Sequence, residues 1–403
     1  MPPLLKKVST RNYRSLADVS VELGAVNVLF GPNGAGKSTF LDVLGFIQEC
    51  AERGVDMACA ARGQGIGLLW DGAGEVGPLS ISLETSGLRY ELSLVLISGR
   101  FHPFPGERLV SLERGLVRIA RGMGSPGAEF LVQNQPVQQE LRDPGKLSLS
   151  RFLDSVAPWE QEGVREVIVL DRLLRSMHFL HARSFALNEL KKRGSEVSHE
   201  TRIGERGLNL WSVLRNLHDR QRLDDRYATI MRFMARSFPL FDGLAFEQTG
   251  ANSIYGLFVE KGGRRPILAS AVSDGHLQML LLLAALFAEG RDQESVLLLD
   301  EPEVSLHPWA LAVLADAVKE AAREWNKQIL IATHSPVLLS QFDPGESFAT
   351  ERREGRTLMR RVSEIPGIED LLKEYATGSL YMAEMVAPQH VAVGEGGGEG
   401  TDG

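Results

Sequence analysis

The stretch GPNGAGKS, residues 31–38, decides the fold of this chain. It has the spacing G-x-x-x-x-G-K-S. An apolar run, residues 26–30, precedes it, and a helix-compatible run, residues 39–50, follows it. A strand, a glycine loop and a helix N-terminus together form an anion site, because backbone N–H groups and the helix dipole both favour a bound phosphate. The sequence therefore predicts a strand–loop–helix unit that binds the phosphates of a nucleotide.

Within this loop the two charged and polar side chains have separate expected roles. Lys37 is expected to reach the β and γ phosphates, and the Ser38 hydroxyl to bind Mg²⁺. ATP and Mg²⁺ are thus the expected cofactors. The alternative is a glycine-rich turn with a chance lysine, which the two flanking segments argue against. The residues expected to surround the phosphates are Gly31, Pro32, Asn33, Gly34, Ala35, Gly36, Lys37, Ser38 and Thr39.

A second motif, SVLLLDEPEVSLH at residues 295–307, predicts hydrolysis. Its four apolar residues, 296–299, are typical of a buried parallel strand. Asp300 follows at the carboxyl end, where ligands bind in doubly wound sheets. Asp300 is expected to hold Mg²⁺ opposite Ser38, and Glu301 to orient and deprotonate the attacking water. The alternative is a core strand that simply ends in acidic residues.

Two further motifs lie at predicted strand or helix ends. In KQILIATHSP, residues 327–336, His334 follows a third apolar strand, and we expect it beside the γ-phosphate as a hydrogen-bond donor. In SDG, residues 273–275, a turn opens a strongly apolar helix. Ser273 or Asp274 is either an ordinary N-cap or part of a helix N-terminus offered to a phosphate.

Patterning along the chain predicts an α/β head interrupted by a helical insertion. Residues 4–30 and 79–97 alternate like strands, and the second stretch predicts a hairpin that turns near Ser86 and Gly87. The last third alternates helix and strand. We expect a head of residues 1–140 and 240–375, a helical insertion of residues 141–239, and a flexible tail of residues 376–403.

Composition is that of an ordinary globular protein, with 43% apolar residues and a net charge of −8. Residues 141–240 nevertheless hold 18 Lys/Arg against 13 Asp/Glu, and they include the run Lys191, Lys192 and Arg193. This segment is either a solvated helical surface or a surface for nucleic acid or an acidic partner. The two cysteines form no C-x-x-C pair, no signal-peptide core is present, and the longest apolar run is too short for a bilayer. A cytoplasmic protein without a membrane partner is expected.

Together the motifs resemble the ABC-type ATPase head of the RecF, SMC and OLD group. The resemblance implies an ABC-type P-loop NTPase fold: a mixed sheet with an antiparallel β lobe. It also identifies Arg11 and Arg14 as basic residues near the nucleotide. The matching stretches are RNYRSL from Arg11, GPNGAGKST from Gly31, SDG from Ser273, LLLDEPEVSLHP from Leu297 and IATHSP from Ile331.

The resemblance further implies a homodimer in which two heads sandwich ATP. Ser273 and Gly275 would contact the nucleotide held by the other subunit, and Ser305 to His307 would be the D-loop between them. The family's Q-loop glutamine is not placed by the sequence. Its candidates are Gln64, Gln133, Gln135, Gln138 and Gln139. His178 and His181 are three residues apart without a further ligand nearby, and we predict no metal there.

The chain is most similar to the short, stand-alone RecF/OLD-like ATPases of bacteria, because it shows neither long coiled coils nor an appended nuclease domain. The resemblance implies an ATP-hydrolysing dimerisation switch, which converts ATP and water to ADP and phosphate. The switch would act on DNA, in repair or antiphage defence, or control an effector protein such as a nuclease or toxin. The alternatives are the nucleotide-binding subunit of a membrane transporter and a non-hydrolysing ATP-binding scaffold.

Overall fold

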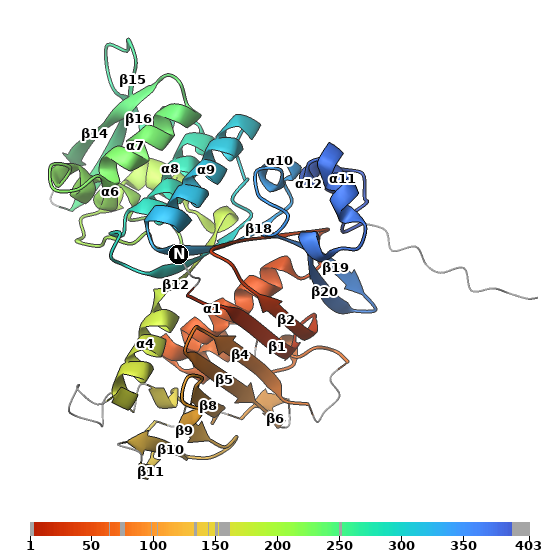
Figure 1. Ribbon diagram of the computed structural model, residues 1–403. Coiled ribbons are helices and arrows are strands. Elements are labelled where there is room, and N and C mark those ends of the chain that lie inside the picture. Colours follow the sequence, from red (N-terminus) through yellow and green to blue (C-terminus); the bar gives the residue numbers. More distant parts are fainter. Residues whose placement is uncertain are drawn as a thin grey trace, which may run out of the picture.

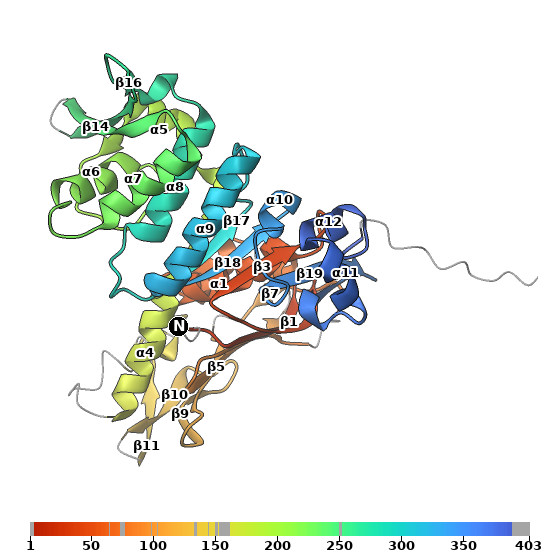
Figure 2. The same cartoon turned by 45° about the horizontal axis from the view of Figure 1, so that its top comes forward.

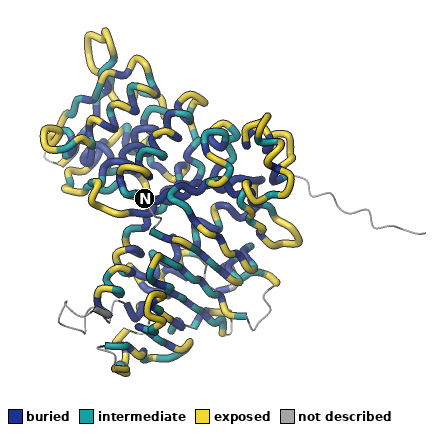
Figure 3. The backbone as a smooth tube through the Cα atoms, viewed as in Figure 1, coloured by how far each residue is buried: buried dark blue, intermediate teal, exposed yellow. Residues whose placement is uncertain are grey.

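Figure 1 shows the computed structural model of the chain. The structure describes residues 4–63, 65–72, 77–97, 99–102, 104–132, 135–143, 145–149, 152, 162–249 and 252–388. A central sheet lies between an antiparallel sheet and a helix-rich part that carries a small third sheet (Figure 1). Buried residues run through the central strands and the helices that pack on them (Figure 3).

In the described residues the central sheet has the strand order β12-β17-β18-β3-β19-β20. The first five strands are parallel, and β20 is antiparallel to β19. Figure 2 shows β17, β18, β3 and β19 side by side across the molecule. The strands are β3 (Val26–Phe30), β12 (Met177–His181), β17 (Ser295–Asp300), β18 (Lys327–Thr333), β19 (Ser347–Arg353) and β20 (Arg356–Arg361).

Helices cover both faces of this sheet, which explains why its central strands are apolar without alternation. Every residue of β3, β17 and β18 is buried. Alternate residues of β17 pack into two different cores. Leu297 and Leu299 join a core with α8 (Asp274–Phe287) and α9 (Pro308–Glu324), while Val296 and Leu298 join a core with α1 (Lys37–Arg53).

The antiparallel sheet packs on the α1 side of the molecule and has the order β11-β10-β9-β8-β5-β4-β1-β2. The predicted hairpin is confirmed, because β4 and β5 pair around Ser86 and Gly87. The strands are β1 (Lys7–Tyr13), β2 (Leu16–Glu22), β4 (Leu79–Glu84), β5 (Leu88–Leu94), β8 (Gly106–Ser111), β9 (Leu116–Arg121), β10 (Gly127–Val132) and β11 (Gln135–Glu140). Nearby lie α2 (Val55–Ala60), η1 (Gly65–Leu68), β6 (Leu96–Ile97) and β7 (Arg100–Phe101).

Residues 141–239 differ from the expected helical insertion. Met177 to His181 form β12, which pairs with β17 as an edge strand of the central sheet, because Met177 and Leu180 bury their side chains there. The other elements of this range are α4 (Glu162–Ser176), η2 (Ala182–Ser184), α5 (Leu187–Arg193), β13 (Ser195–Glu196), α6 (Leu210–Asp219) and α7 (Arg226–Ser237).

A small third sheet joins this range to the later part of the chain. β13 pairs with β15, which also pairs with β14 and β16. These strands are β14 (Phe241–Thr249), β15 (Ser253–Glu260) and β16 (Ile267–Leu268), and η3 (Ala269–Ala271) follows them. Trp211 of α6 is fully buried against this sheet and lies 6.1 Å from Phe258, centroid to centroid. Helices of residues 187–237 therefore share one core with the sheet.

The tail expected from residue 376 onward is partly wrong. Thr377 to Met382 form α12, in which Leu380 and Tyr381 are buried, and the Tyr381 ring lies 5.2 Å from Phe30 of the central sheet. Apolar side chains at successive helical positions hold this segment against the core. Residues 389–403 lie outside the described part. The remaining elements are α10 (Pro336–Leu339), η4 (Val362–Glu364) and α11 (Ile368–Glu374).

Among the described residues, no helix combines the length and apolar character needed to cross a bilayer.

Candidate nucleotide site

The glycine loop connects β3 to α1, as predicted, and is packed against the edge of the central sheet. Gly31 has φ +148°, and a Cβ there would lie 2.0 Å from the Thr350 carbonyl of β19. Gly36 has φ +108°, and a Cβ there would lie 2.2 Å from Thr357 Oγ1 of β20. Only glycine satisfies both the dihedral angle and the space. The loop is therefore held in one shape by two neighbouring strands.

Lys37 is buried at the start of α1 and donates to the backbone of the loop. Its Nζ lies 2.9 Å from the Gly31 carbonyl and 3.0 Å from the Pro32 carbonyl. It also lies 3.4 Å from His334 Nδ1. Burial lowers the pKa of Lys37 from 10.5 to about 8, against the attraction of Asp300 and Glu301. Within the described part of the chain no carboxylate pairs with Lys37 directly, so its charge is free to serve an anion.

Ser38 and Asp300 meet across two neighbouring strand ends. The Ser38 hydroxyl donates to Asp300 Oδ1 at 2.9 Å. This contact follows from the parallel order β17-β18-β3, which brings the carboxyl ends of these strands to one edge. Burial raises the pKa of Asp300, against the Ser38 hydrogen bond, which lowers it. A bound cation would replace the hydroxyl proton as the partner of this buried carboxylate.

Glu301 and His334 lie beside this pair. Glu301 has φ +52°, a left-handed conformation that is unusual for a non-glycine residue and is found most often at functional sites. Its Oε1 lies 3.7 Å from His334 Nε2. Glu303 accepts a hydrogen bond from the His334 backbone N–H at 2.7 Å. Burial lowers the pKa of His334, and the neighbouring Lys37 lowers it further.

The SDG turn lies against Ser305, which is expected to belong to the D-loop. A Cβ on Gly275 would lie 2.5 Å from the Ser305 carbonyl, so glycine is required for this close approach. Ser273 is the N-cap residue of α8, but its side chain caps no backbone N–H. Its Oγ instead lies 2.6 Å from His276 Nδ1. The Ser273 hydroxyl is thus placed at the surface of the turn, together with Gly275.

The two N-terminal arginines have different surroundings. Arg14 forms an ion pair with Asp42 of α1 (2.8 Å), which ties it to the helix that follows the glycine loop. Arg11 pairs with Asp18 on the neighbouring strand (3.1 Å), and both side chains are exposed. Among the described contacts, neither arginine meets Lys37, Ser38 or Asp300.

Three residues of the site were missed by sequence reasoning. His181, at the end of β12, lies 3.2 Å from Asp300 Oδ2 through its Nδ1, and Arg183 forms an ion pair with Glu301. Lys191 of α5 donates to Asp274 Oδ1 and to the Val272 carbonyl, both at 2.7 Å, so it contacts the SDG turn. The sequence signal for His181 and Arg183 was the short run of residues 177–180 before them, but this run continues a helical pattern and was not recognised as a strand.

The three Q-loop candidates that the structure describes are not brought to this site. Gln135, Gln138 and Gln139 lie on β11, the far edge strand of the antiparallel sheet (Figure 1). Gln64 and Gln133 lie outside the described residues. No glutamine named from the sequence therefore accompanies the carboxylates of β17 in the described part of the chain.

The residues present fit ATP and Mg²⁺. Among the described residues no cluster of three or more His, Cys, Asp or Glu could hold a metal alone. Mg²⁺ needs no such cluster, because it is bound by one or two protein oxygens together with phosphates and water. Ser38 Oγ and Asp300 Oδ1 supply two such oxygens, and the glycine loop and Lys37 supply donors for phosphate.

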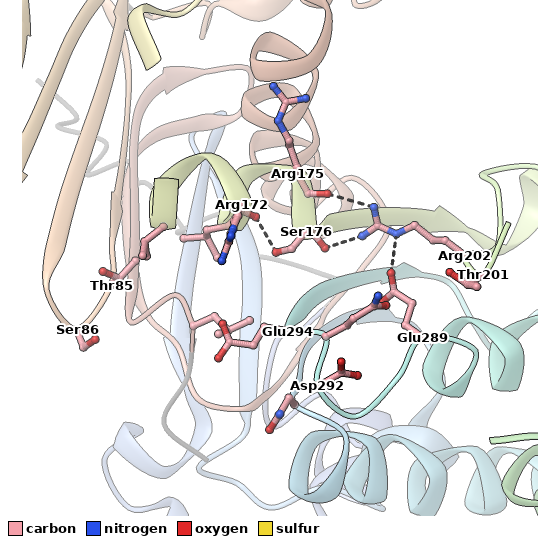
Figure 4. Close-up of a pocket in the computed structure, with 15 residues that line it drawn as sticks. Thr85, Ser86, Arg172, Arg175, Ser176, Thr201, Arg202, Glu289, Asp292 and Glu294 are labelled. Atoms are coloured by element: carbon pink, nitrogen blue, oxygen red, sulfur yellow. Dashed lines mark hydrogen bonds and ion pairs between the residues drawn. The ribbon is translucent and has the colours of Figure 1, made fainter. Parts of the chain in front are cut away.

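A cavity of about 800 Å³ lies at the opposite end of the same strands (Figure 4). It is lined by Ser176, Glu294 and Asn326, each of which directly precedes a strand of the central sheet. Arg202 reaches into it, donates to the Ser176 carbonyl at 2.8 Å and lies 3.3 Å from Glu289. Two of the charged side chains that line this cavity, Arg202 and Glu289, therefore pair with each other.

A glycine loop before α1, an aspartate at the end of β17, a histidine after β18 and an SDG turn before α8 define an ABC-type P-loop ATPase head. Residues 26–340 match the family described as "AAA domain, putative AbiEii toxin, Type IV TA system". The chain belongs to this family, and thus to a class of nucleotide-binding ATPases. No curated protein sequence matches the chain.

Solved structures of SMC heads are similar in fold. The SmcHead bound to the C-winged helix domain of ScpA shares 15% identity over 90% of this chain and 99% of that chain, with a TM-score of 0.52. The Smc head domain with an extended coiled coil, bound to the C-terminal domain of ScpA derived from Pyrococcus furiosus, shares 12% identity over 92% and 99%, with a TM-score of 0.49. The first similarity confirms the predicted ABC-type head fold.

Proposed function

We propose that the protein is a Mg²⁺-dependent ATPase whose two heads dimerise around ATP. The observation that carries the proposal is the hydrogen bond of 2.9 Å between the Ser38 hydroxyl and Asp300. The neighbouring Lys37 is buried, donates to loop carbonyls and has no carboxylate in direct contact among the described residues. A phosphate-binding loop alone would serve any nucleotide-binding protein. A Ser–Asp pair next to Glu301 and His334 supports hydrolysis as well.

Each residue has a distinct part in the proposed reaction. Lys37 and the loop N–H groups bind the β and γ phosphates, and Ser38 and Asp300 hold Mg²⁺. Bound Mg²⁺ neutralises charge on the transferred phosphoryl group. Glu301 orients the attacking water and accepts its proton, while His334 donates to the γ-phosphate. The burial that lowers the pKa of His334 is compatible with a neutral imidazole, which still has one N–H to donate.

The dimer is proposed from the other half of the site. Gly275 approaches Ser305 closely, Ser273 is exposed, and no described contact joins either of them to the glycine loop of their own chain. Large apolar side chains are exposed nearby: Leu240, which lines a cavity together with Ser273, is 65% exposed, and Trp309, four residues after Ser305, is 61% exposed. We propose that this face closes over the nucleotide of a second copy, and that Arg11 and Arg14 lie near that nucleotide.

The output of the switch is proposed to be control of a protein effector, with DNA as the second candidate. The family's description includes a toxin of a toxin–antitoxin system, which supports an effector. The excess of basic residues in 141–240 supports DNA, and Lys192 and Arg193 are exposed there. A role in antiphage defence or repair and a cytoplasmic location belong to this proposal. So does the division into a head of residues 1–140 and 240–375 and an insertion within residues 141–239, from which β12 is excluded because it belongs to the central sheet.

The proposal is tested with Glu301→Gln. We expect the variant to bind ATP like the wild type but to hydrolyse it about 10² to 10⁴ times more slowly, as for a lost general base. Its mass in sedimentation should double with ATP, because the dimer forms but is not released. Lys37→Ala is the matched control, which should neither bind ATP nor dimerise. Absence of an ATP-dependent gain in mass for Glu301→Gln contradicts the dimer.

A further inference from the structure

Arg183 lies just beyond the end of β12, at the same edge of the central sheet as the proposed nucleotide site. β12 pairs in parallel with β17, and His181 lies opposite Asp300 in the register. Arg183 follows His181 by two residues, in η2, and Glu301 follows Asp300 directly. This register places the guanidinium against the carboxylate, and Arg183 Nε forms an ion pair with Glu301 Oε2.

The contacts of Glu301 divide its carboxylate between two partners. Oε2 faces Arg183, and Oε1 lies 3.7 Å from His334 Nε2. The backbone N–H of Glu301 donates to the Ala332 carbonyl of β18 at 2.8 Å, which fixes its left-handed conformation. The backbone is therefore held by the sheet, while the direction of the carboxylate depends on the two side chains.

The segment that carries Arg183 is itself held in place. The Ala182 carbonyl accepts a hydrogen bond from Nε2 of Gln278 at 3.5 Å, and Gln278 is buried in α8. On the other side, the Ala186 N–H donates to the Arg206 carbonyl at 2.9 Å, and Phe185 is buried. Arg183 thus extends from a fixed backbone, and α8, which begins at the SDG turn, is one of the elements that fix it.

We infer that Arg183 is a positioning residue that holds the Glu301 carboxylate in the direction required of a general base. The inference rests on the proposed function. The side chain of Arg183 is 65% exposed and that of Glu301 only 16%. Exposed ion pairs contribute little to folding because water screens them. The contact is an ion pair without a hydrogen bond to Oε2 among the described residues, so it acts by placing a guanidinium charge on a fixed backbone beside the carboxylate. The planar guanidinium is not interchangeable with an ammonium at such a site.

The test compares Arg183→Ala, Arg183→Lys and the control Arg206→Ala. Arg206 is a similarly exposed arginine that pairs with Glu189 at 2.6 Å, away from the carboxylates of β17. We expect Arg183→Ala to lower kcat about 10- to 100-fold, the effect of a misplaced reacting group. Its KM and Kd for ATP and its melting temperature should not change. Arg183→Lys should retain part of the lost rate, and Arg206→Ala should match the wild type.

A double variant shows whether Arg183 acts through Glu301. In single-turnover assays, Arg183→Ala combined with Glu301→Gln should be no slower than Glu301→Gln alone, because there is no base left to position. Multiplied losses, or an unchanged kcat in Arg183→Ala, overturn this inference and leave the proposed function standing. Wild-type hydrolysis by Glu301→Gln overturns the proposed role of Glu301, and the inference with it.

Discussion

The two ends of the central sheet each bury a lysine, and the two lysines differ in their partners. Lys37 lies at the carboxyl ends of the strands and Lys327 at the amino ends, where it begins β18. Lys327 Nζ lies 3.0 Å from Glu289 Oε2 and donates to the Gln293 carbonyl, also at 3.0 Å. Lys37 donates to two loop carbonyls and has no carboxylate partner among the described residues.

This difference separates a structural ion pair from a ligand site. Burial would raise the pKa of Glu289, but Lys327 and Arg202 outweigh it and hold that pKa below its ordinary value. The amino end is thus a closed network of charges, next to the cavity of Figure 4. At the carboxyl end, Lys37 has no carboxylate in direct contact among the described residues, although Asp300 and Glu301 attract it from nearby. A buried cation without a direct partner is costly, and a bound phosphate reduces that cost.

The largest expected effects come from removing each lysine in turn. Lys327→Met should lower the free energy of unfolding by about 3 kcal/mol, because it removes the hydrogen-bonded partner of the buried Glu289 and leaves only Arg202 beside that carboxylate. Lys37→Ala should abolish ATP binding while the fold stays intact, because no carboxylate loses a partner. Urea unfolding and equilibrium ATP titration on both variants measure the two effects. A stable Lys327→Met protein, or wild-type ATP affinity in Lys37→Ala, breaks the comparison.

The next prediction concerns the surface that faces the second copy. Ser273→Arg should remove hydrolysis but leave ATP binding to the single chain unchanged, because the arginine would fill the space needed by the other subunit's γ-phosphate. Phosphate release and ATP titration check the two parts. Mixing Ser273→Arg with Lys37→Ala then restores one intact composite site, and partial activity should return. Full hydrolysis by Ser273→Arg alone would reduce the SDG turn to a helix end.

The carboxyl end of the sheet was predictable because its residues follow recognisable strands. Lys37, Ser38 and Asp300 stand directly after continuous apolar runs, and parallel strands of this kind end at one edge. The structure brings these three together as predicted. The same rule missed His181 and Arg183, because MHFLH at residues 177–181 continues the helical pattern of α4 and its two histidines interrupt the apolar run of the strand.

The network of ion pairs at the amino ends of the central strands was not predicted. Glu289 and Arg202 are 87 residues apart, and Lys327 is a further 38 residues along the chain from Glu289. No spacing in the sequence links them, because their contact depends on how three separate segments pack beneath the strands. The position of α12 was missed for a similar reason, because the Tyr381 ring packs against Phe30, a residue near the opposite end of the sequence.

Low pH should lower the free energy of unfolding through a histidine near the amino ends of the central strands. His178 is buried beside Arg202, and burial lowers its pKa from 6.5 to about 3. Below about pH 6.5 His178 is therefore protonated in the unfolded chain but stays neutral in the folded protein. The contribution of the neutral His178 to stability is complete above pH 6.5 and is lost as the pH falls. Between pH 7 and pH 5 the loss should be about 2 kcal/mol.

Urea unfolding of the wild type and His178→Gln at the two pH values measures this contribution. The variant should lose less stability on acidification than the wild type, by about the same 2 kcal/mol. Equal acid sensitivity in wild type and His178→Gln would remove His178 from the network.

The smallest expected effect on ATP hydrolysis comes from a third lysine, Lys191, compared with its two neighbours in the sequence. Lys191 is only 14% exposed and is committed to Asp274 of the SDG turn, whereas the next two residues, Lys192 and Arg193, are exposed. Lys191→Glu should lower ATP hydrolysis several-fold through repulsion of Asp274, with nucleotide binding unchanged. Lys192→Glu with Arg193→Glu should leave hydrolysis unchanged.

The exposed pair then tests the proposed output. If DNA binds this surface, the double reversal should weaken binding about equally across sequences and lower the salt slope by about 1 for each lost phosphate contact. Gel shifts with single- and double-stranded DNA at low salt, with ATP present, measure both. An acidic protein partner shares the salt sensitivity, so the DNA itself must be seen to bind. If the wild-type protein binds neither form of DNA, the effector protein remains as the proposed ligand of the switch. The surface of residues 191–193 would then be connected to the proposed ATP site through the contact of Lys191 with the SDG turn.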